Sequence, residues 1–339
     1  MLLPIYGGAL RRFPFEVLLV VVSILLGVTI VESYCRLVYT EPWYQSLLGE
    51  SEEVSPNASV KLNTFGLRDK DFSDVVPHDC KRVLILGDSF TFGQGVKEEE
   101  AIFPRLLEKQ LNSLLSPKGL SVEILNGGLP GSLTNNWLDL LNRVIVPFKP
   151  DIVLIVFFLR DGTRLGSMGH FFDPIRREIQ GRSIANRTNE SILYRHSYLY
   201  RLFQDFLDRS FLARKYSELL NESYFGGTDK TEEWERAKVN IRKIKAVSES
   251  HGAVIGMVIF PVLVELNESY PFQGIVNHLV KFGKEGQIPT HNLLPSFLGM
   301  HAPDLWVSSL DQHPNALGHD IAATSILPFL NQFLENQKD

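Results

Sequence analysis

The chain has 339 residues, a formal net charge of −5 and 44% hydrophobic residues. This length can bury a large core in one big domain or two, and the composition excludes a disordered chain. The slightly acidic balance disfavours nucleic acid and other polyanions as partners. The two cysteines, Cys35 and Cys80, do not form a disulfide framework.

The N-terminus carries an apolar segment that is predicted to enter a membrane. Arg11 and Arg12 come first, and residues 17–31 then carry no charge and are almost wholly aliphatic. Together with the residues before them, they approach the roughly 20 residues that a bilayer-spanning helix needs. We predict a cytoplasmic N-terminus at 1–12 and a transmembrane anchor at 13–33, because arginines favour the cytoplasmic side. A cleaved signal peptide and a buried core helix are the alternatives.

The rest of the chain is then expected on the extracytoplasmic side, which in a bacterium is the periplasm. Residues 34–80 are predicted to form a polar linker, in which 60–68 alternate enough to be an edge strand. Beyond them strands and helices alternate, which predicts a parallel α/β sheet with right-handed crossovers over 81–335. A polar, mostly helical insertion at about 162–250 interrupts this alternation and is interpreted as a lid or a substrate-shaping wall.

The elements of the α/β domain are short apolar strands separated by helices with apolar residues at helical spacing. Strands are expected at 83–86, 122–125, 152–159, 254–260 and near 289–294. Helices are expected at about 101–115, 135–145, 232–250, 272–282 and from after Pro314 to about 325, with Pro328 opening a last turn.

The most informative motif directly follows the first of these strands. Gly87 breaks the apolar run, and Asp88 and Ser89 come next, so the serine is expected on the turn at the strand's carboxyl end. Ligands bind at that edge of open α/β sheets, where a hydroxyl can be exposed beside its own backbone N–H. An ordinary turn with a capping serine is the alternative.

Two other loops carry the groups that activate a serine. Asp311 stands two residues before His313, at the expected entry to the last helix, where it can orient the imidazole. Serine is a poor nucleophile until such a base takes its proton. The glycines at 126–131 let backbone N–H groups approach a ligand, and one can donate to a developing oxyanion. A helix-capping His313 and an ordinary glycine turn are the alternatives.

The order of these motifs resembles the GDSL/SGNH hydrolase superfamily, in the version found in membrane-anchored bacterial envelope proteins. The resemblance covers roughly residues 60–330, including Asn-Thr-Phe-Gly-Leu-Arg at 63–68 and Phe-Gly-Gln-Gly-Val at 92–96. It implies a flavodoxin-like three-layer α/β/α fold and hydrolysis or transfer of an ester-linked acyl group. The substrate would be an acylated envelope glycan, lipid or small molecule. No phosphate-binding glycine fingerprint or complete metal-ligand set occurs, so we expect no cofactor and no metal.

The resemblance also implies roles for individual residues. By position, Ser89 is the nucleophile, His313 is the general base and Asp311 orients His313. The backbone N–H groups of Ser89 and Gly131 form part of the oxyanion hole. Gly131 is chosen because the family's glycine usually lies five residues after the asparagine that ends the second strand. Many relatives place the aspartate three residues before the histidine instead of two.

One position departs from the family's pattern. Arg160 stands after the third strand, where the family has the asparagine whose amide points at the oxyanion. Losing that donor typically costs about 10²–10³ in rate, but a guanidinium is a charged donor and can take its place if its reach fits. Otherwise Arg160 pairs with an acid or an anionic substrate group, and the protein is a catalytically silent glycan-binding or assembly protein. A third hypothesis is a subunit whose activity needs an envelope protein partner.

Overall fold

The computed structural model describes residues 15–39, 60–163, 192–229, 231–308 and 311–336. The chain divides into two compact units. The first contains Met1–Pro42 and Glu178–Leu212, and the second contains Trp43–Arg177 and Ala213–Asp339. Helix α7 (Tyr198–Phe225) begins in the first unit and ends in the second.

The second unit is built on a five-stranded parallel sheet in the order β2-β1-β3-β4-β5. This is the flavodoxin-like doubly wound order, in which the strand order reverses between β1 and β3. The α/β fold with a central parallel sheet is therefore confirmed. The strands are β1 (Cys80–Gly87), β2 (Ser121–Gly128), β3 (Ile152–Phe158), β4 (Val254–Phe260) and β5 (Thr290–Asn292).

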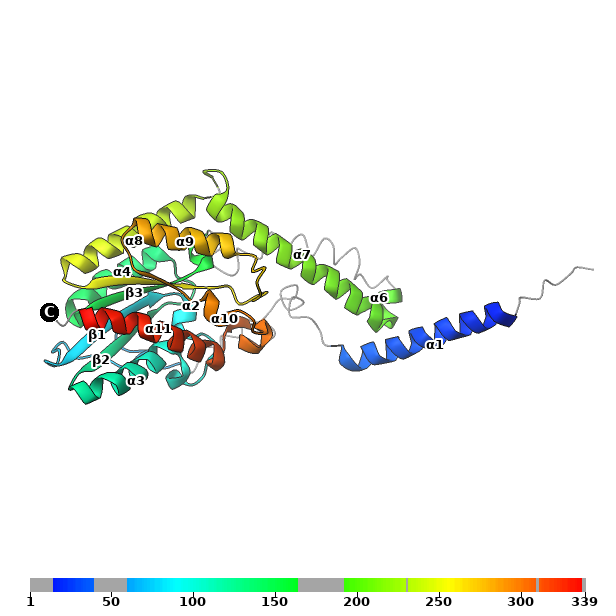
Figure 1. Cartoon of the computed structure of the whole chain (residues 1–339), viewed down its shortest axis with the longest axis horizontal. Helices are drawn as coiled ribbons and strands as arrows, with labels where there is room; N and C mark the ends of the chain where they lie inside the picture. The colour runs from blue at the N-terminus through cyan, green and yellow to red at the C-terminus, as the bar shows by residue number, and fades with distance from the viewer. Residues whose placement is uncertain (1–14, 40–59, 164–191, 230, 309–310, 337–339) are drawn as a thin grey trace, which may run out of the picture. The chain divides into compact units, whose positions relative to one another are not determined.

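Helices cover both faces of the sheet, which completes the three-layer arrangement (Figure 1). Each of these helices buries a stripe of apolar side chains against the sheet. In α3 this stripe contains Leu107, Leu111 and Leu115, at four-residue spacing. One face carries α4 (Thr134–Phe148), α8 (Glu232–Ser250) and α9 (Gln273–Glu285), and the other carries α3 (Phe103–Leu115) and α11 (Ala316–Asn336).

The expected edge strand at 60–68 is wrong, because this segment forms a compact turn. The side-chain oxygen of Asn63 accepts hydrogen bonds from the backbone N–H groups of Phe65 and Leu67. Gly66 takes a positive φ of 76° between them. An asparagine side chain can replace a strand partner in this way, so alternation of apolar residues alone did not decide the structure.

Two helices also differ from the expectation. The helix at 232–250, expected within the insertion, is α8 and covers the sheet as the crossover between β3 and β4, with Trp234 and Ile241 fully buried. Residues 164–191 of the expected insertion lie outside the described residues. The last helix, α11, continues past Pro328 to Asn336 instead of ending near 325.

The first unit contains the apolar helix α1 (Phe15–Val38), the short helix α6 (Ile192–His196) and the beginning of α7. The 24 residues of α1 extend over about 36 Å, and its length and composition suffice to cross a membrane. Residues 15–31 are all exposed in this unit, so the described residues give no support to a buried core helix. A membrane anchor and a signal sequence both fit these properties.

Candidate active site

Ser89 is the first residue of α2 (Ser89–Phe92), a short helix that follows β1. Asp88 caps this helix, because its Oδ1 accepts a hydrogen bond from the Phe90 N–H at 2.8 Å. The first N–H groups of a helix have no partner within it. The backbone N–H of Ser89 therefore lies beside its hydroxyl without an intrahelical partner, at the carboxyl edge of the sheet.

Two glycines bring α2 close to the neighbouring strands. A Cβ atom at Gly87 would lie 2.1 Å from Thr91 Oγ1, and one at Gly128 would lie 2.2 Å from the backbone nitrogen of Phe92. Gly128 is therefore enclosed and serves packing. Gly131, by contrast, is exposed, has a φ of +70° and has nothing within 4 Å of a Cβ position. Of these glycines, Gly131 presents an accessible backbone in the loop after β2.

His313 lies on β7 (Asp311–Pro314), which pairs antiparallel with β6 (Trp306–Ser308). The last helix, α11, begins at Ala316, shortly after Pro314 as expected, but the sequence analysis did not predict the strand that carries His313. The imidazole Nε2 is 2.8 Å from Ser89 Oγ, although the two residues are 224 positions apart. On its other side, Nδ1 is 2.5 Å from Asp311 Oδ1, which also accepts the backbone N–H of His313 at 3.0 Å.

The surroundings fix the direction of these hydrogen bonds. Burial alone would raise the pKa of Asp311, but the hydrogen bonds from the His313 ring and backbone outweigh it and hold this pKa below its ordinary value. An ionised carboxylate only accepts, so Nδ1 carries the imidazole proton and Nε2 offers its lone pair to the Ser89 hydroxyl. Ser89 and His313 are 2% and 6% exposed, and water competes little for this bond.

Arg160 lies in the 3₁₀ turn η4 (Leu159–Gly162) directly after β3 and is only 7% exposed. Its Nη2 is 3.8 Å from Asp88 Oδ2, on the cap of the serine helix. In the part of the chain that the structure describes, neither Asp88 Oδ2 nor Arg160 Nε has a hydrogen-bond partner. Burial raises the pKa of Asp88, against the opposing effect of the Arg160 charge. The Arg160–Asp88 pair therefore leaves one donor, Arg160 Nε, and one acceptor, Asp88 Oδ2, without a hydrogen bond among the described residues.

A second set of buried polar residues supports the two loops of the site, and the motif analysis did not find its role. The Arg68 guanidinium donates to the carbonyls of Gly93 at 2.6 Å and Val96 at 2.7 Å, where the chain leaves α2. Asp69 accepts the backbone N–H of Asn126 at 2.8 Å, near the end of β2 and before the loop that carries Gly131.

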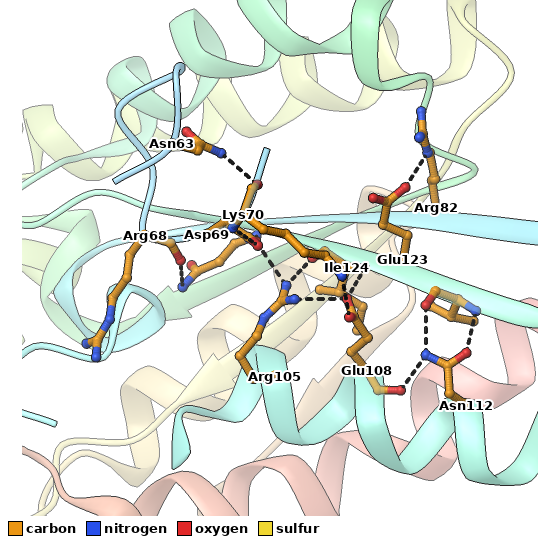
Figure 2. A network of polar contacts seen from close by, with 12 residues as sticks. Asn63, Arg68, Asp69, Lys70, Arg82, Arg105, Glu108, Asn112, Glu123 and Ile124 are labelled. Atoms are coloured by element: carbon orange, nitrogen blue, oxygen red, sulfur yellow. Dashed lines mark hydrogen bonds and ion pairs between the residues drawn. The ribbon is translucent and has the colours of Figure 1, made fainter. Parts of the chain in front are cut away.

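The same Asp69 oxygen pairs with Arg105 on α3 at 2.9 Å, and Figure 2 shows the two side chains pointing toward one another. The only signal in the sequence was the motif at 63–68, which ends at Arg68 directly before Asp69. Its partners are 24 to 57 positions away along the chain, so spacing could not reveal them.

No group of three or more His, Cys, Asp or Glu residues in the described ranges is placed to hold a metal ion. The chemistry available at the carboxyl edge of the sheet is that of a hydroxyl, an imidazole, a carboxylate and backbone N–H groups. The Arg160 guanidinium lies beside Asp88, the residue before Ser89.

No family model and no curated protein matches this sequence. Several solved structures are similar in fold. A lipolytic protein of the G-D-S-L family from Desulfitobacterium hafniense is 13% identical, with 73% of this chain and 98% of that chain covered and a TM-score of 0.40. A carbohydrate acetylesterase family member from Sinorhizobium meliloti is 14% identical, with 75% and 99% covered and a TM-score of 0.43. An acetylxylan esterase from Geobacillus stearothermophilus is 15% identical, with 75% and 94% covered and a TM-score of 0.43.

Proposed function

We propose that the protein is a serine-dependent ester hydrolase or O-acyltransferase. Ser89 is the nucleophile, His313 is the general base and Asp311 orients His313. The observation that carries this proposal is the continuous chain of hydrogen bonds from Asp311 through His313 to Ser89 Oγ. Both bonds lie within the reach that proton transfer requires, without any rearrangement of the side chains.

The reaction proceeds in two acyl-transfer steps. Ser89 Oγ attacks the carbonyl carbon of the ester while His313 Nε2 takes the hydroxyl proton. The bond from this carbon to the alcohol oxygen then breaks, and His313 returns the proton to the departing alcohol. Water, or a sugar hydroxyl in the transferase case, next gives its proton to His313 and attacks the acyl-enzyme. The imidazolium finally reprotonates Ser89, which restores the starting state.

The oxyanion of each tetrahedral intermediate needs donors. The backbone N–H groups of Ser89 and Gly131 are two of them in this proposal, and Arg160 is the third. The unpartnered Arg160 Nε supports this role, because a buried donor without a partner is costly and an oxyanion would satisfy it. The guanidinium charge strengthens such a bond relative to the amide of an asparagine.

The substrate class in this proposal is an acylated envelope glycan, lipid or small molecule. Helix α1 anchors the protein to the membrane, and the α/β unit faces the extracytoplasmic side. The arginines at 11 and 12, before the apolar stretch, support this orientation. No cofactor takes part, because each step uses only groups of the chain and of the substrates.

Hydrolysis of p-nitrophenyl acetate tests the enzymatic proposal. The wild type is expected to release p-nitrophenol, and Ser89→Ala is expected to lower kcat by about 10³-fold or more, since the nucleophile is lost. The control Ser250→Ala removes an exposed serine at the end of α8 and is expected to leave the rate unchanged. Equal rates for wild type and Ser89→Ala would remove Ser89 from the mechanism.

A silent glycan-binding or assembly protein is the second candidate, and the Arg160–Asp88 pair favours it. In that case Arg160 neutralises the helix cap and contributes nothing to turnover. The variant Arg160→Asn restores the family's residue and separates the two functions. Hydrolysis that appears only in Arg160→Asn indicates a silent wild type, whereas a wild type at least as active as the variant indicates an enzyme that uses the guanidinium.

A further inference from the structure

The beginning of α7 is fixed to α1 inside the first unit. The Glu32 carboxylate accepts the backbone N–H groups of Tyr198 at 2.6 Å and Leu199 at 3.0 Å, and the Ser197 hydroxyl at 2.8 Å. These N–H groups belong to the first turn of α7 and have no partner within their own helix. A side chain of α1 therefore caps α7, and the negative charge complements the positive end of the helix dipole.

Arginine and tyrosine side chains surround this junction. Two guanidinium groups lie over the Tyr198 ring, that of Arg36 at 4.9 Å and that of Arg201 at 4.6 Å from its centroid. Arg201 also lies 5.3 Å from the ring centroid of Tyr194 and 5.8 Å from that of Tyr39. Tyrosine and arginine are the side chains that gather where a membrane-spanning helix meets the headgroups, because each has an apolar body and a polar end.

An exposed apolar surface continues from this junction. Leu199, Phe203, Phe206 and Leu207 follow the spacing i, i+4, i+7, i+8, which places them on one face of α7. All four are exposed, Phe203 by 55% and Phe206 by 65%. Ile192 and Leu193 on α6 are exposed as well. Large apolar side chains gathered on one exposed surface indicate a docking surface.

We propose that residues 192–207, called here the interfacial segment, lie in the headgroup region of the bilayer with this apolar face toward the acyl chains. This inference rests on the proposed anchoring by α1. The uncharged stretch of α1 ends at Val31, so Glu32 marks the edge of the hydrocarbon core. Because the first turn of α7 is bound to Glu32, it has to lie at the same depth. The positive charges of Arg36, Arg195 and Arg201 match anionic headgroups.

The proposal fixes the depth of single positions. The full chain, with Cys35→Ala and Cys80→Ala, is reconstituted in vesicles of phosphatidylethanolamine and phosphatidylglycerol that carry doxyl-labelled acyl chains. An NBD fluorophore is attached to Phe206→Cys, and its quenching is compared with that at Gln204→Cys on another side of the same turn. Strong quenching at position 206 and weak quenching at 204 are expected.

Two further labels separate this proposal from the anchoring itself. Ile24→Cys reports whether α1 is inserted, and Glu218→Cys reports an exposed position of α7 in the second unit. Quenching at 24 without quenching at 206 overturns the interfacial segment and leaves the anchor intact. Absence of quenching at 24 overturns both. Equal quenching at 204, 206 and 218 also overturns it, since no apolar face is then selected.

The junction at Glu32 offers a second test. Glu32→Ala removes the acceptor of three hydrogen bonds and is expected to reduce quenching at position 206 while leaving quenching at position 24 unchanged. A loss at both positions, or at neither, contradicts the role given to Glu32. Cross-links between two copies through position 206 would show that a second copy covers this face, which also overturns the proposal.

Discussion

At the scale of single residues, the bond between Asp311 and His313 decides which imidazole nitrogen faces Ser89. The lowered pKa of Asp311 keeps its carboxylate ionised at neutral pH, so it holds the proton on Nδ1. An asparagine of the same shape can donate its own N–H to Nδ1 and stabilise the opposite tautomer. That tautomer presents a proton to Ser89 and cannot act as a base.

We therefore expect Asp311→Asn to lower kcat by about 10⁴-fold with little change in KM, because the ring keeps its place and loses its basic nitrogen. Steady-state hydrolysis of p-nitrophenyl acetate measures this effect. The control is Asp304→Asn, an exposed acid before β6 that pairs with His301 at the surface. A kcat for Asp311→Asn within tenfold of the wild type would show that the carboxylate does not orient the base.

At the scale of elements, the segment from Asn63 to Lys70 joins the two loops that carry the site. Arg68 donates to the carbonyls where the chain leaves α2. Asp69 accepts the backbone N–H of Asn126 near the end of β2, before the loop that carries Gly131. Loss of Arg68 should therefore move Ser89 relative to His313, which changes reactivity and stability together. Arg82 is equally buried near the amino end of β1 and pairs with Glu123 (Figure 2). It also donates to the carbonyls of Phe148 and Ser73, so its loss should affect stability alone.

We expect Arg68→Ala to slow the reaction of Ser89 with a fluorophosphonate by about tenfold or more, since small misplacements of reacting groups have large effects. Arg82→Ala should lower the melting temperature by a similar amount and leave this rate per folded molecule unchanged. Added guanidinium should partly restore the rate in Arg68→Ala only. Equal rates in both variants would reduce Arg68 to a purely structural role.

The contribution of Asp69 to stability is also expected to depend on pH, and the sign of this dependence follows from its pKa. Burial raises the pKa of Asp69 to about 6, against the effect of Arg105 and the backbone N–H groups, whereas the unfolded chain titrates near 3.8. Between these values the native state binds a proton that the unfolded state lacks. The contribution of Asp69 to the free energy of unfolding therefore falls as the pH rises from about 4 to about 6, by about 3 kcal/mol, and stays constant above.

Urea unfolding of wild type and Asp69→Asn at several pH values measures this contribution. The difference in unfolding free energy, wild type minus variant, should decrease between pH 4 and pH 6. A difference that increases with pH would mean that Arg105 holds the pKa of Asp69 below the value of the unfolded chain.

The pattern of apolar residues predicted two kinds of element: strands that are buried on both faces, and helices that bury one regular apolar stripe. The runs that begin at Val83, Ile152 and Val254 lie within buried strands, as expected for a parallel sheet. The acidic residues around Trp234 made α8 look like a charged helix of the insertion, so its buried apolar stripe was not predicted. The turn at Asn63 depends on one side chain that bonds the backbone, and no periodicity reports such a contact.

At the scale of the whole molecule, three distant loops meet at one edge of the sheet. The order of the motifs and the family resemblance were enough to name Ser89, His313 and Asp311 as candidates. The parallel sheet explains the place of Ser89 after β1, whereas Asp311 and His313 lie on β7, outside that sheet. Motif order could not place Arg160 opposite Asp88, since that contact depends on which way a long side chain turns. The contact of Glu32 with the start of α7 likewise joins residues 165 to 167 positions apart that share no motif.

Whether the N-terminal segment is retained or cleaved can be tested on the whole chain. The proposed anchor requires α1 to cross the bilayer without cleavage. We therefore expect the full chain to stay in the membrane fraction after carbonate extraction, and the peptide before Phe13 to be detected in it by mass spectrometry. A cleaved signal sequence predicts the opposite, a soluble protein whose N-terminal peptide is missing. High-salt washing serves as the control, since it releases only peripherally bound protein.

The most direct test of the account is the position of a fluorophosphonate adduct in the intact protein. Peptide mass spectrometry after reaction at neutral pH should show one modified residue, Ser89. The adduct should be absent in Ser89→Ala and strongly reduced in His313→Gln, because the hydroxyl reacts only when the imidazole takes its proton. No adduct on the folded wild type, or one that persists in Ser89→Ala, would contradict an activated serine at the end of β1.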